Sequence, residues 1–137
     1  MDDSTIRGVI FLITNNENRF LLEQRDGNSK LSKWSWAFPG GAKDEGEDTL
    51  QTVIREAKEE FGIDLKPNEC EKLGTSVTHS GRGMNEIWHC PLKDVPKPLV
   101  VSESAGAGWF TLEEIKKMDL GYKQTELVLP ILNKKFL

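Results

Sequence analysis

The stretch Gly41–Ile63, GAKDEGEDTLQTVIREAKEEFGI, decides the fold because it contains a helix whose two ends and buried face are all encoded locally. Asp48 is a favourable N-cap, and Gln51 follows it at the capping-box spacing that satisfies two of the first free backbone donors. Gly62 can adopt the left-handed conformation that ends many helices. The sequence therefore predicts a helix that begins just after Glu47 and ends at Gly62.

Apolar residues recur at helical spacing along this helix and form one stripe: Leu50, Val53, Ile54, Ala57 and Phe61. The carboxylates of Glu56, Glu59 and Glu60 share one flank, where each like-charged pair costs roughly 0.2–0.5 kcal/mol. A divalent cation such as Mg²⁺ or Mn²⁺ would offset that repulsion, whereas a solvated acidic face is the plain alternative. Glu60 falls next to Val53 at the edge of the stripe, so we expect it to be partly buried.

The rest of the chain alternates strand and helix patterns. Strands are predicted within Val9–Ile13, Arg19–Arg25, Trp34–Phe38, Cys70–Ser80 and Met84–Leu92. A second capping box, Thr111 with Glu114, begins a helix over Leu112–Met118, and a third helix occupies much of Lys123–Lys135, where Pro130 either starts a segment or kinks it. This order indicates an α/β domain with a mixed sheet sandwiched between helices.

Composition limits the classes of function. The 137 residues fit one domain over 1–137, and with 37% hydrophobic and 29% charged residues they have the composition of a globular protein. A net charge of −4 argues against binding to a nucleic acid polymer. The acidic amino terminus is unlike a secretory signal, and Val9–Ile13 is too short to span a bilayer, so we expect a cytoplasmic protein without a membrane partner.

The two cysteines, Cys70 and Cys90, are interpreted as reduced thiols, with a disulfide as the alternative if the fold brings them together. The sequence does not favour a zinc site formed by these cysteines with His79 and His89, because it contains no closely spaced pair of metal ligands such as C-x2-C.

Gly41, Glu47, Arg55, Glu56, Glu59, Glu60 and Gly62 match the Nudix box, G-x5-E-x7-R-E-U-x-E-E-x-G-U, at every fixed position. Ile63 fits the last aliphatic position, whereas Ala57 is smaller than the usual residue at the other one. The resemblance extends to Leu21–Arg25, Trp36–Gly41 and Trp109–Ile115. The chain is therefore similar to Nudix hydrolases, and the resemblance implies the Nudix fold.

The same resemblance implies a Mg²⁺ or Mn²⁺ site and several residue roles. The expected metal ligands are Glu56, Glu59, Glu60 and the Gly40 carbonyl. Arg55 is expected to orient the carboxylates by ion pairing. Glu47 is expected to support the loop and the helix rather than to contact substrate.

The remaining site residues are implied with alternatives open. The implied catalytic set is Glu56, Arg55, Glu59 and Glu103, in which the general base is either Glu56 or Glu103. Arg25 and Arg82 are candidate phosphate contacts, with an ordinary surface arginine as the equal alternative. Trp34 is expected to be exposed and available to stack on a nucleobase, whereas Trp36 is expected to pack.

The implied reaction is the attack of water on a phosphorus of a nucleoside diphosphate linked to another group. The Trp36–Gly41 segment and the small size of the chain resemble those of MutT-type enzymes, which hydrolyse (d)NTPs to NMP and pyrophosphate. Hydrolysis of ADP-ribose, a dinucleoside polyphosphate or a nucleotide sugar is the alternative, as is a non-catalytic nucleotide-binding module. An isoprenoid diphosphate isomerase is disfavoured because neither cysteine lies in a recognisable active-site motif. The expected partner is a small nucleoside diphosphate derivative, and the protein is expected to be a monomer or a homodimer.

Overall fold

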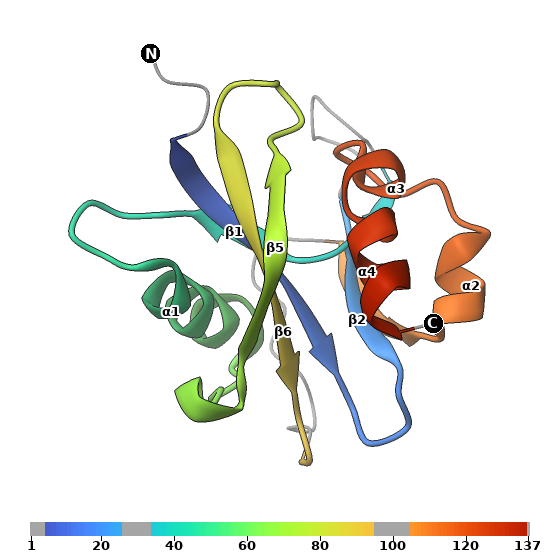
Figure 1. Cartoon of the computed structure of the whole chain (residues 1–137). Coiled ribbons are helices and arrows are strands. Elements are labelled where there is room, and N and C mark those ends of the chain that lie inside the picture. Colours follow the sequence, from blue (N-terminus) through green and yellow to red (C-terminus); the bar gives the residue numbers. More distant parts are fainter. Residues whose placement is uncertain (1–4, 26–33, 95–104, 137) are drawn as a thin grey trace.

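The computed structural model describes residues 5–25, 34–94 and 105–136. The strands are β1 (Ile6–Thr14), β2 (Phe20–Gln24), β3 (Trp36–Ala37), β4 (Gly40–Ala42), β5 (Glu71–Val77), β6 (Met84–Pro91) and β7 (Gly106–Phe110). The helices are α1 (Thr49–Phe61), the 3₁₀ turn η1 (Pro67–Glu69), α2 (Leu112–Lys116), α3 (Gln124–Leu127) and α4 (Leu129–Phe136). Helix α1 lies on one side of the strands, and α2, α3 and α4 lie on the other (Figure 1). This arrangement confirms the predicted mixed sheet between helices.

Strand β1 is the centre of the molecule because its side chains enter two separate cores. Residues Val9 to Ile13 are all at most 8% exposed, as predicted for a strand buried on both faces. Val9, Phe11 and Ile13 pack with α1 residues such as Phe61, whereas Ile10 and Leu12 pack under α4 against residues that include Leu132. The alternation of a strand's side chains thus fixes a helical layer on each face.

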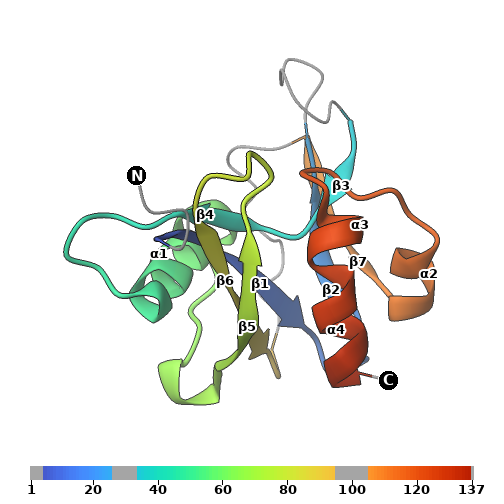
Figure 2. The ribbon, with the colours of Figure 1, turned by 45° about the horizontal axis from the view of Figure 1, so that its top comes forward.

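The seven-stranded sheet has the order β3-β2-β1-β6-β5, with β4 also paired to β1 and β7 to β2. Strands β1 and β6 run parallel from Ile6↔Met84 to Thr14↔Pro91. The other pairs in the sheet are antiparallel. From the second viewpoint, β4 runs along β1 on the α1 side, while β3 and β7 flank β2 near α3 (Figure 2).

Helix α1 has the ends that the sequence predicts. The Asp48 carboxylate accepts a hydrogen bond from the Gln51 backbone N–H at 2.8 Å, and the Gln51 side chain accepts one from the Asp48 N–H at 2.8 Å. Gly62 ends the helix at φ 67°, in the left-handed region. The fully buried Val53, Ala57 and Phe61 lock α1 onto the sheet, and burial of a side chain the size of Val or Phe stabilises the fold by roughly 1.5–3 kcal/mol.

Several predicted elements differ from those observed. The predicted helix over Lys123–Lys135 is divided into α3 and α4, and Pro130 is the second residue of α4, where the helix needs no donor from it. Strand β7 was not predicted, because Gly106, Ala107 and Gly108 carry almost no hydrophobic pattern. Strand β4 was not predicted either, because Pro39-Gly40-Gly41 resembles a turn, whereas Gly40–Ala42 pairs with β1.

None of the helices within the described ranges is long and apolar enough to cross a membrane.

Candidate active site

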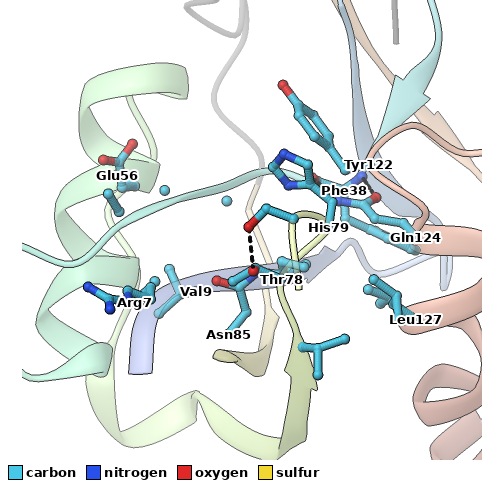
Figure 3. A pocket seen from close by; sticks show the side chains of 18 of the residues that line it. Arg7, Val9, Phe38, Glu56, Thr78, His79, Asn85, Tyr122, Gln124 and Leu127 are labelled. Carbon is cyan, nitrogen blue, oxygen red and sulfur yellow. Dashed lines mark hydrogen bonds between the residues drawn. The ribbon is translucent and has the colours of Figure 1, made fainter. Parts of the chain in front are cut away.

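A cavity of about 600 Å³ opens between α1 and the α2–α3 connection. Its floor is formed by β1 and β4, and its walls by Glu56 and Glu60 of α1, by the turn between β5 and β6, and by Tyr122 with α3. Figure 3 shows Glu56 on one side of the cavity, with Tyr122 and Gln124 on the other. The cavity therefore has an acidic end and an aromatic end.

The acidic end contains two of the three helix glutamates. Glu56 and Glu60, four positions apart on α1, both line the cavity, and Glu60 is only 9% exposed, as expected from its place beside the apolar stripe. Glu59 does not line the cavity, and its side chain is 59% exposed. The structure thus places Glu56 and Glu60 at the cavity, whereas Glu59 contacts the same Arg55 Nη1 as Glu56 at 3.3 Å, and the expectation that Glu59 is a metal ligand stays a prediction.

Glycines let the backbone of β4 lie directly against these carboxylates. A Cβ added to Gly41 would lie 2.7 Å from the Glu56 Oε1, and one added to Gly40 would lie 2.5 Å from the Val9 carbonyl oxygen. No L side chain fits such gaps without a shift. Gly41 therefore leaves the space that the Glu56 side chain occupies, whereas Gly40 allows the close approach of β4 to β1.

Arg55 fixes the orientation of the acidic end. Its Nε and Nη2 donate to the two Glu47 carboxylate oxygens at 2.8 and 2.9 Å, and its Nη1 donates to Glu56 Oε1 at 2.9 Å. Nη1 also reaches Glu59 at 3.3 Å, and Nη2 donates to the Ala42 carbonyl at 3.1 Å. One guanidinium thus connects the loop before α1, strand β4 and the acidic flank of the helix, and the ion pairs expected between Arg55 and the carboxylates are present.

Glu47 supports the loop rather than lining the cavity. Hydrogen bonds from Arg55, from the Asp44 backbone N–H at 3.1 Å and from the Thr52 hydroxyl at 2.7 Å lower the pKa of Glu47 from 4.5 to about 2. The hydrogen bonds to Glu47 in turn raise the pKa of Arg55. Both groups are therefore charged over the whole physiological range.

The aromatic end was missed by sequence reasoning. Tyr122 lies between the Arg25 guanidinium, 4.8 Å from its ring centroid, and the His79 ring, whose centroid is 5.1 Å away. Gln124, 3% exposed, accepts from the Phe38 N–H at 2.7 Å and donates to the Phe38 carbonyl at 3.2 Å. Tyr122 and Lys123 both have positive φ, 56° and 57°. Strained backbone of this kind is concentrated at functional sites, but it leaves no pattern in the sequence.

The other side chains that the sequence suggested for substrate contacts and catalysis lie in different places. Arg25 and Arg82 both line the cavity. Trp34 is exposed, as expected, at 59%, but it does not line the cavity. Trp36 packs edge-on against Phe110, with ring centroids 5.0 Å apart. Glu103 lies outside the described residues.

The oxygen atoms at the acidic end fit a hard divalent cation that takes only a few of its ligands from the protein. In the described part of the chain, no three His, Cys, Asp or Glu side chains converge to hold an ion. The carboxylates of Glu56 and Glu60, which line the cavity together with Gly40 and Gly41, nevertheless suit Mg²⁺, which proteins commonly hold through one or two carboxylates plus waters and substrate phosphates.

The fold and this acidic helix together define a recognised domain class. The NUDIX domain pattern matches residues 4–129, which is most of the chain, so the chain belongs to the NUDIX domain family. The sequence resemblance to the family is thereby confirmed.

Several named proteins are similar to this chain in sequence. The chain is 29% identical over 112 residues to "Nucleoside diphosphate-linked moiety X motif 6" of Xenopus laevis, covering 79% of this chain and 51% of that protein. It is 30% identical over 108 residues to "Nudix hydrolase 2" of Arabidopsis thaliana, covering 76% and 38%. It is 33% identical over 79 residues to the "8-oxo-dGTP diphosphatase" of Proteus vulgaris, covering 58% and 67%. The chain spans about half or less of the length of the first two relatives.

Solved structures share the fold at low identity. The MutT protein from Methanosarcina mazei Go1 superposes with a TM-score of 0.75 at 23% identity and covers 100% of this chain and 99% of its own. An Ap4A hydrolase from C. elegans superposes with a TM-score of 0.71 at 23% identity, covering 94% and 95%.

Proposed function

We propose that this protein is a pyrophosphohydrolase that uses Mg²⁺ or Mn²⁺ to hydrolyse a small nucleoside diphosphate derivative. The observation that carries the proposal is the position of Glu56 and Glu60 in one cavity with the Gly40–Gly41 strand. Membership of the NUDIX domain family supports the proposal, as do the names of two relatives, a Nudix hydrolase and an 8-oxo-dGTP diphosphatase.

Glu56 and Glu60, with the Gly40 carbonyl, are the proposed ligands of the cation. When bound there, the cation would neutralise charge on the pyrophosphate and polarise the phosphorus under attack. Glu59 is the remaining candidate from the sequence, and its exposed position supports a role through Arg55, which it reaches at 3.3 Å. A Mn ion accompanies AMP in a bifunctional NMN adenylyltransferase/ADP ribose pyrophosphatase of the same fold from Francisella tularensis.

Glu56 is the proposed acceptor of the proton of the attacking water. Arg55 holds its Oε1, and the carboxylate lines the cavity, so it is both oriented and within reach of a bound substrate. Glu103 is the alternative acceptor. If Glu103 were the base, Glu103→Gln would lower turnover more than Glu56→Gln at saturating metal.

The phosphates are proposed to lie at the acidic end, with Arg25 and Arg82 compensating their charge. The nucleoside then extends toward Phe38, Tyr122 and Gln124. We favour a (d)NTP that is cleaved to NMP and pyrophosphate, a proposal supported by the relation to an 8-oxo-dGTP diphosphatase. Monomer or homodimer, and cytoplasmic location, stay predictions.

The test is a screen over (d)NTPs, 8-oxo-dGTP, ADP-ribose, dinucleoside polyphosphates and nucleotide sugars in which the products are separated by chromatography, with Mg²⁺, with Mn²⁺ and with excess EDTA. We expect turnover with a nucleotide only when metal is present, and NMP plus pyrophosphate as products. Undiminished turnover in EDTA would contradict the proposed metal site. Nucleotide binding without turnover of any substrate would instead indicate a non-catalytic module.

A further inference from the structure

Cys70 lies immediately before strand β5, and Cys90 lies in the neighbouring strand β6. Strands β5 and β6 pair antiparallel with Glu71 opposite His89 and Lys72 opposite Trp88. Continued by one residue, this register places Cys70 opposite Cys90. Facing residues of an antiparallel pair have Cα atoms roughly 4.5–5.5 Å apart, and a disulfide needs about 4.4–6.8 Å. The backbone thus already has the spacing of a cross-strand disulfide.

The side chains share one environment as well. Cys90 is fully buried in the core beneath α1, and the half-buried Cys70 packs against that same core. We propose that Cys70 and Cys90 form a modification site at which a hydroperoxide reversibly converts the two thiols to an intramolecular disulfide. This inference does not depend on the proposed hydrolase activity.

The two thiols differ in a way that assigns their roles. The two thiols shift each other's pKa in opposite directions: the Cys90 thiol lowers the pKa of Cys70, whereas Cys70 and burial raise the pKa of Cys90. Cys70 is also the one that is accessible, at the start of β5, where its thiol lies 3.5 Å from the Lys66 carbonyl. Cys70 is therefore the attacking thiolate, and Cys90 is the resolving thiol.

The chemistry balances with one hydroperoxide. The Cys70 sulfur attacks the distal peroxide oxygen, the O–O bond breaks, and the leaving oxygen takes a proton to become an alcohol, or water when the oxidant is hydrogen peroxide. The Cys90 sulfur then attacks the resulting Cys70 sulfenic acid. The S–S bond forms as the S–O bond breaks, and the oxygen leaves as water with the Cys90 proton. A thiol reductant reverses the change.

The disulfide would close the β5–β6 hairpin at the end remote from the cavity. In the described sheet β5 lies at an edge, where it pairs with β6 alone, and its register shifts between Lys72 and Gly74. The opposite end of the hairpin, with Thr78 and His79, lines the cavity. We therefore expect oxidation to stabilise the fold and to leave the cavity intact.

The experiment treats the reduced full chain with hydrogen peroxide in small excess and follows mass, free thiols and Tm. We expect a loss of two hydrogens in mass, no free thiol after denaturation, a cross-linked peptide containing Cys70 and Cys90, and a Tm raised by roughly 5 °C or more. Dithiothreitol should restore the starting values. Disulfide-linked dimers, sulfinic or sulfonic acid at Cys70, or no reaction at all would overturn the proposal.

Two variants separate the roles of the thiols without relying on the disulfide itself. In Cys90→Ala, Cys70 should accumulate sulfenic acid that dimedone traps, because no resolving thiol remains. In Cys70→Ala, the buried Cys90 should be unreactive under the same treatment. Equal reactivity of the single cysteines in the two variants would contradict the assignment, even if one variant is less stable.

Discussion

Gly41 shows how a single residue without a side chain sets the position of Glu56, the proposed proton acceptor. Because a Cβ there would lie 2.6 Å from the Glu56 Cγ and 2.7 Å from its Oε1, Gly41→Ala should displace the carboxylate. The displaced group is the end of a flexible side chain, so we expect little change in Tm but a fall in turnover on the order of tenfold or more.

Gly106→Ala is the matched control, since a Cβ at Gly106 meets nothing within 4 Å and its backbone is not left-handed. It should keep both turnover and Tm. Equal activity of the two alanine variants in a steady-state assay would show that Glu56 does not need its observed position.

Glu47 connects one carboxylate to the pH dependence of stability. Its pKa is about 2 in the folded protein against an ordinary 4.5, so the unfolded chain takes up this proton first as pH falls. The stabilisation is fully present above pH 4.5 and is lost progressively as the pH falls toward 2.

We therefore predict that the stability advantage of the native protein over Glu47→Gln is constant above pH 5 and shrinks below about pH 4.5. Urea unfolding of both proteins at matched pH values measures this difference, and the other carboxylates cancel in the comparison. An advantage that stays the same down to pH 2.5 would mean that Glu47 is not held by Arg55 in solution.

Helix α1 was predictable because its determinants are local. The side chains of Asp48 and Gln51, three residues apart, cap its first turn, and Gly62 ends it. The spacing of Val53, Ala57 and Phe61 identifies its buried face. The partial burial of Glu60 follows from the same helical spacing and is confirmed. The second capping box, Thr111 with Glu114, is confirmed for the same reason, with bonds of 2.8 and 3.2 Å.

The elements that escaped prediction depend on contacts distant in sequence. Strand β7 exists because β2 pairs with it from Phe20↔Phe110 to Gln24↔Gly106, and its glycines supply no pattern of their own. The aromatic end of the cavity escaped for a similar reason. His79 and Tyr122 come from different parts of the chain, and only the tertiary fold brings their rings together.

The contribution of the Asp48 cap to the stability of α1 can be tested by substitution. Asp48→Ala removes the acceptor for the Gln51 N–H, so the free energy of unfolding should fall by about 1 kcal/mol. Asp48→Asn retains an acceptor and should stay within a few tenths of a kcal/mol of the native protein. Chemical denaturation measures both. A stable Asp48→Ala protein would indicate that tertiary packing alone holds the start of α1.

At the scale of the whole molecule, the fold places the two ends of the cavity on opposite helical layers. Glu56 and Glu60 come from α1 on one side of the sheet, whereas Tyr122 and Gln124 come from the α2–α4 layer on the other (Figures 1 and 3). Strand β1 with β4 forms the floor between them. A substrate that spans the cavity would thus have its charged part at one layer and its planar part at the other.

Whether Glu60 belongs to a metal site or to a solvated acidic face is tested most directly by turnover and metal-free Tm measured together on Glu60→Gln. If Glu60 is a metal ligand, turnover should fall on the order of 10² to 10⁴, and the metal-free Tm should hold or rise slightly because repulsion from Glu56 is removed. Glu59→Gln is the control from the same turn, and its exposed position predicts a much smaller loss. A stable Glu60→Gln protein with turnover within about twofold of the native value, as neutral surface substitutions give, would contradict a metal-binding role of Glu60.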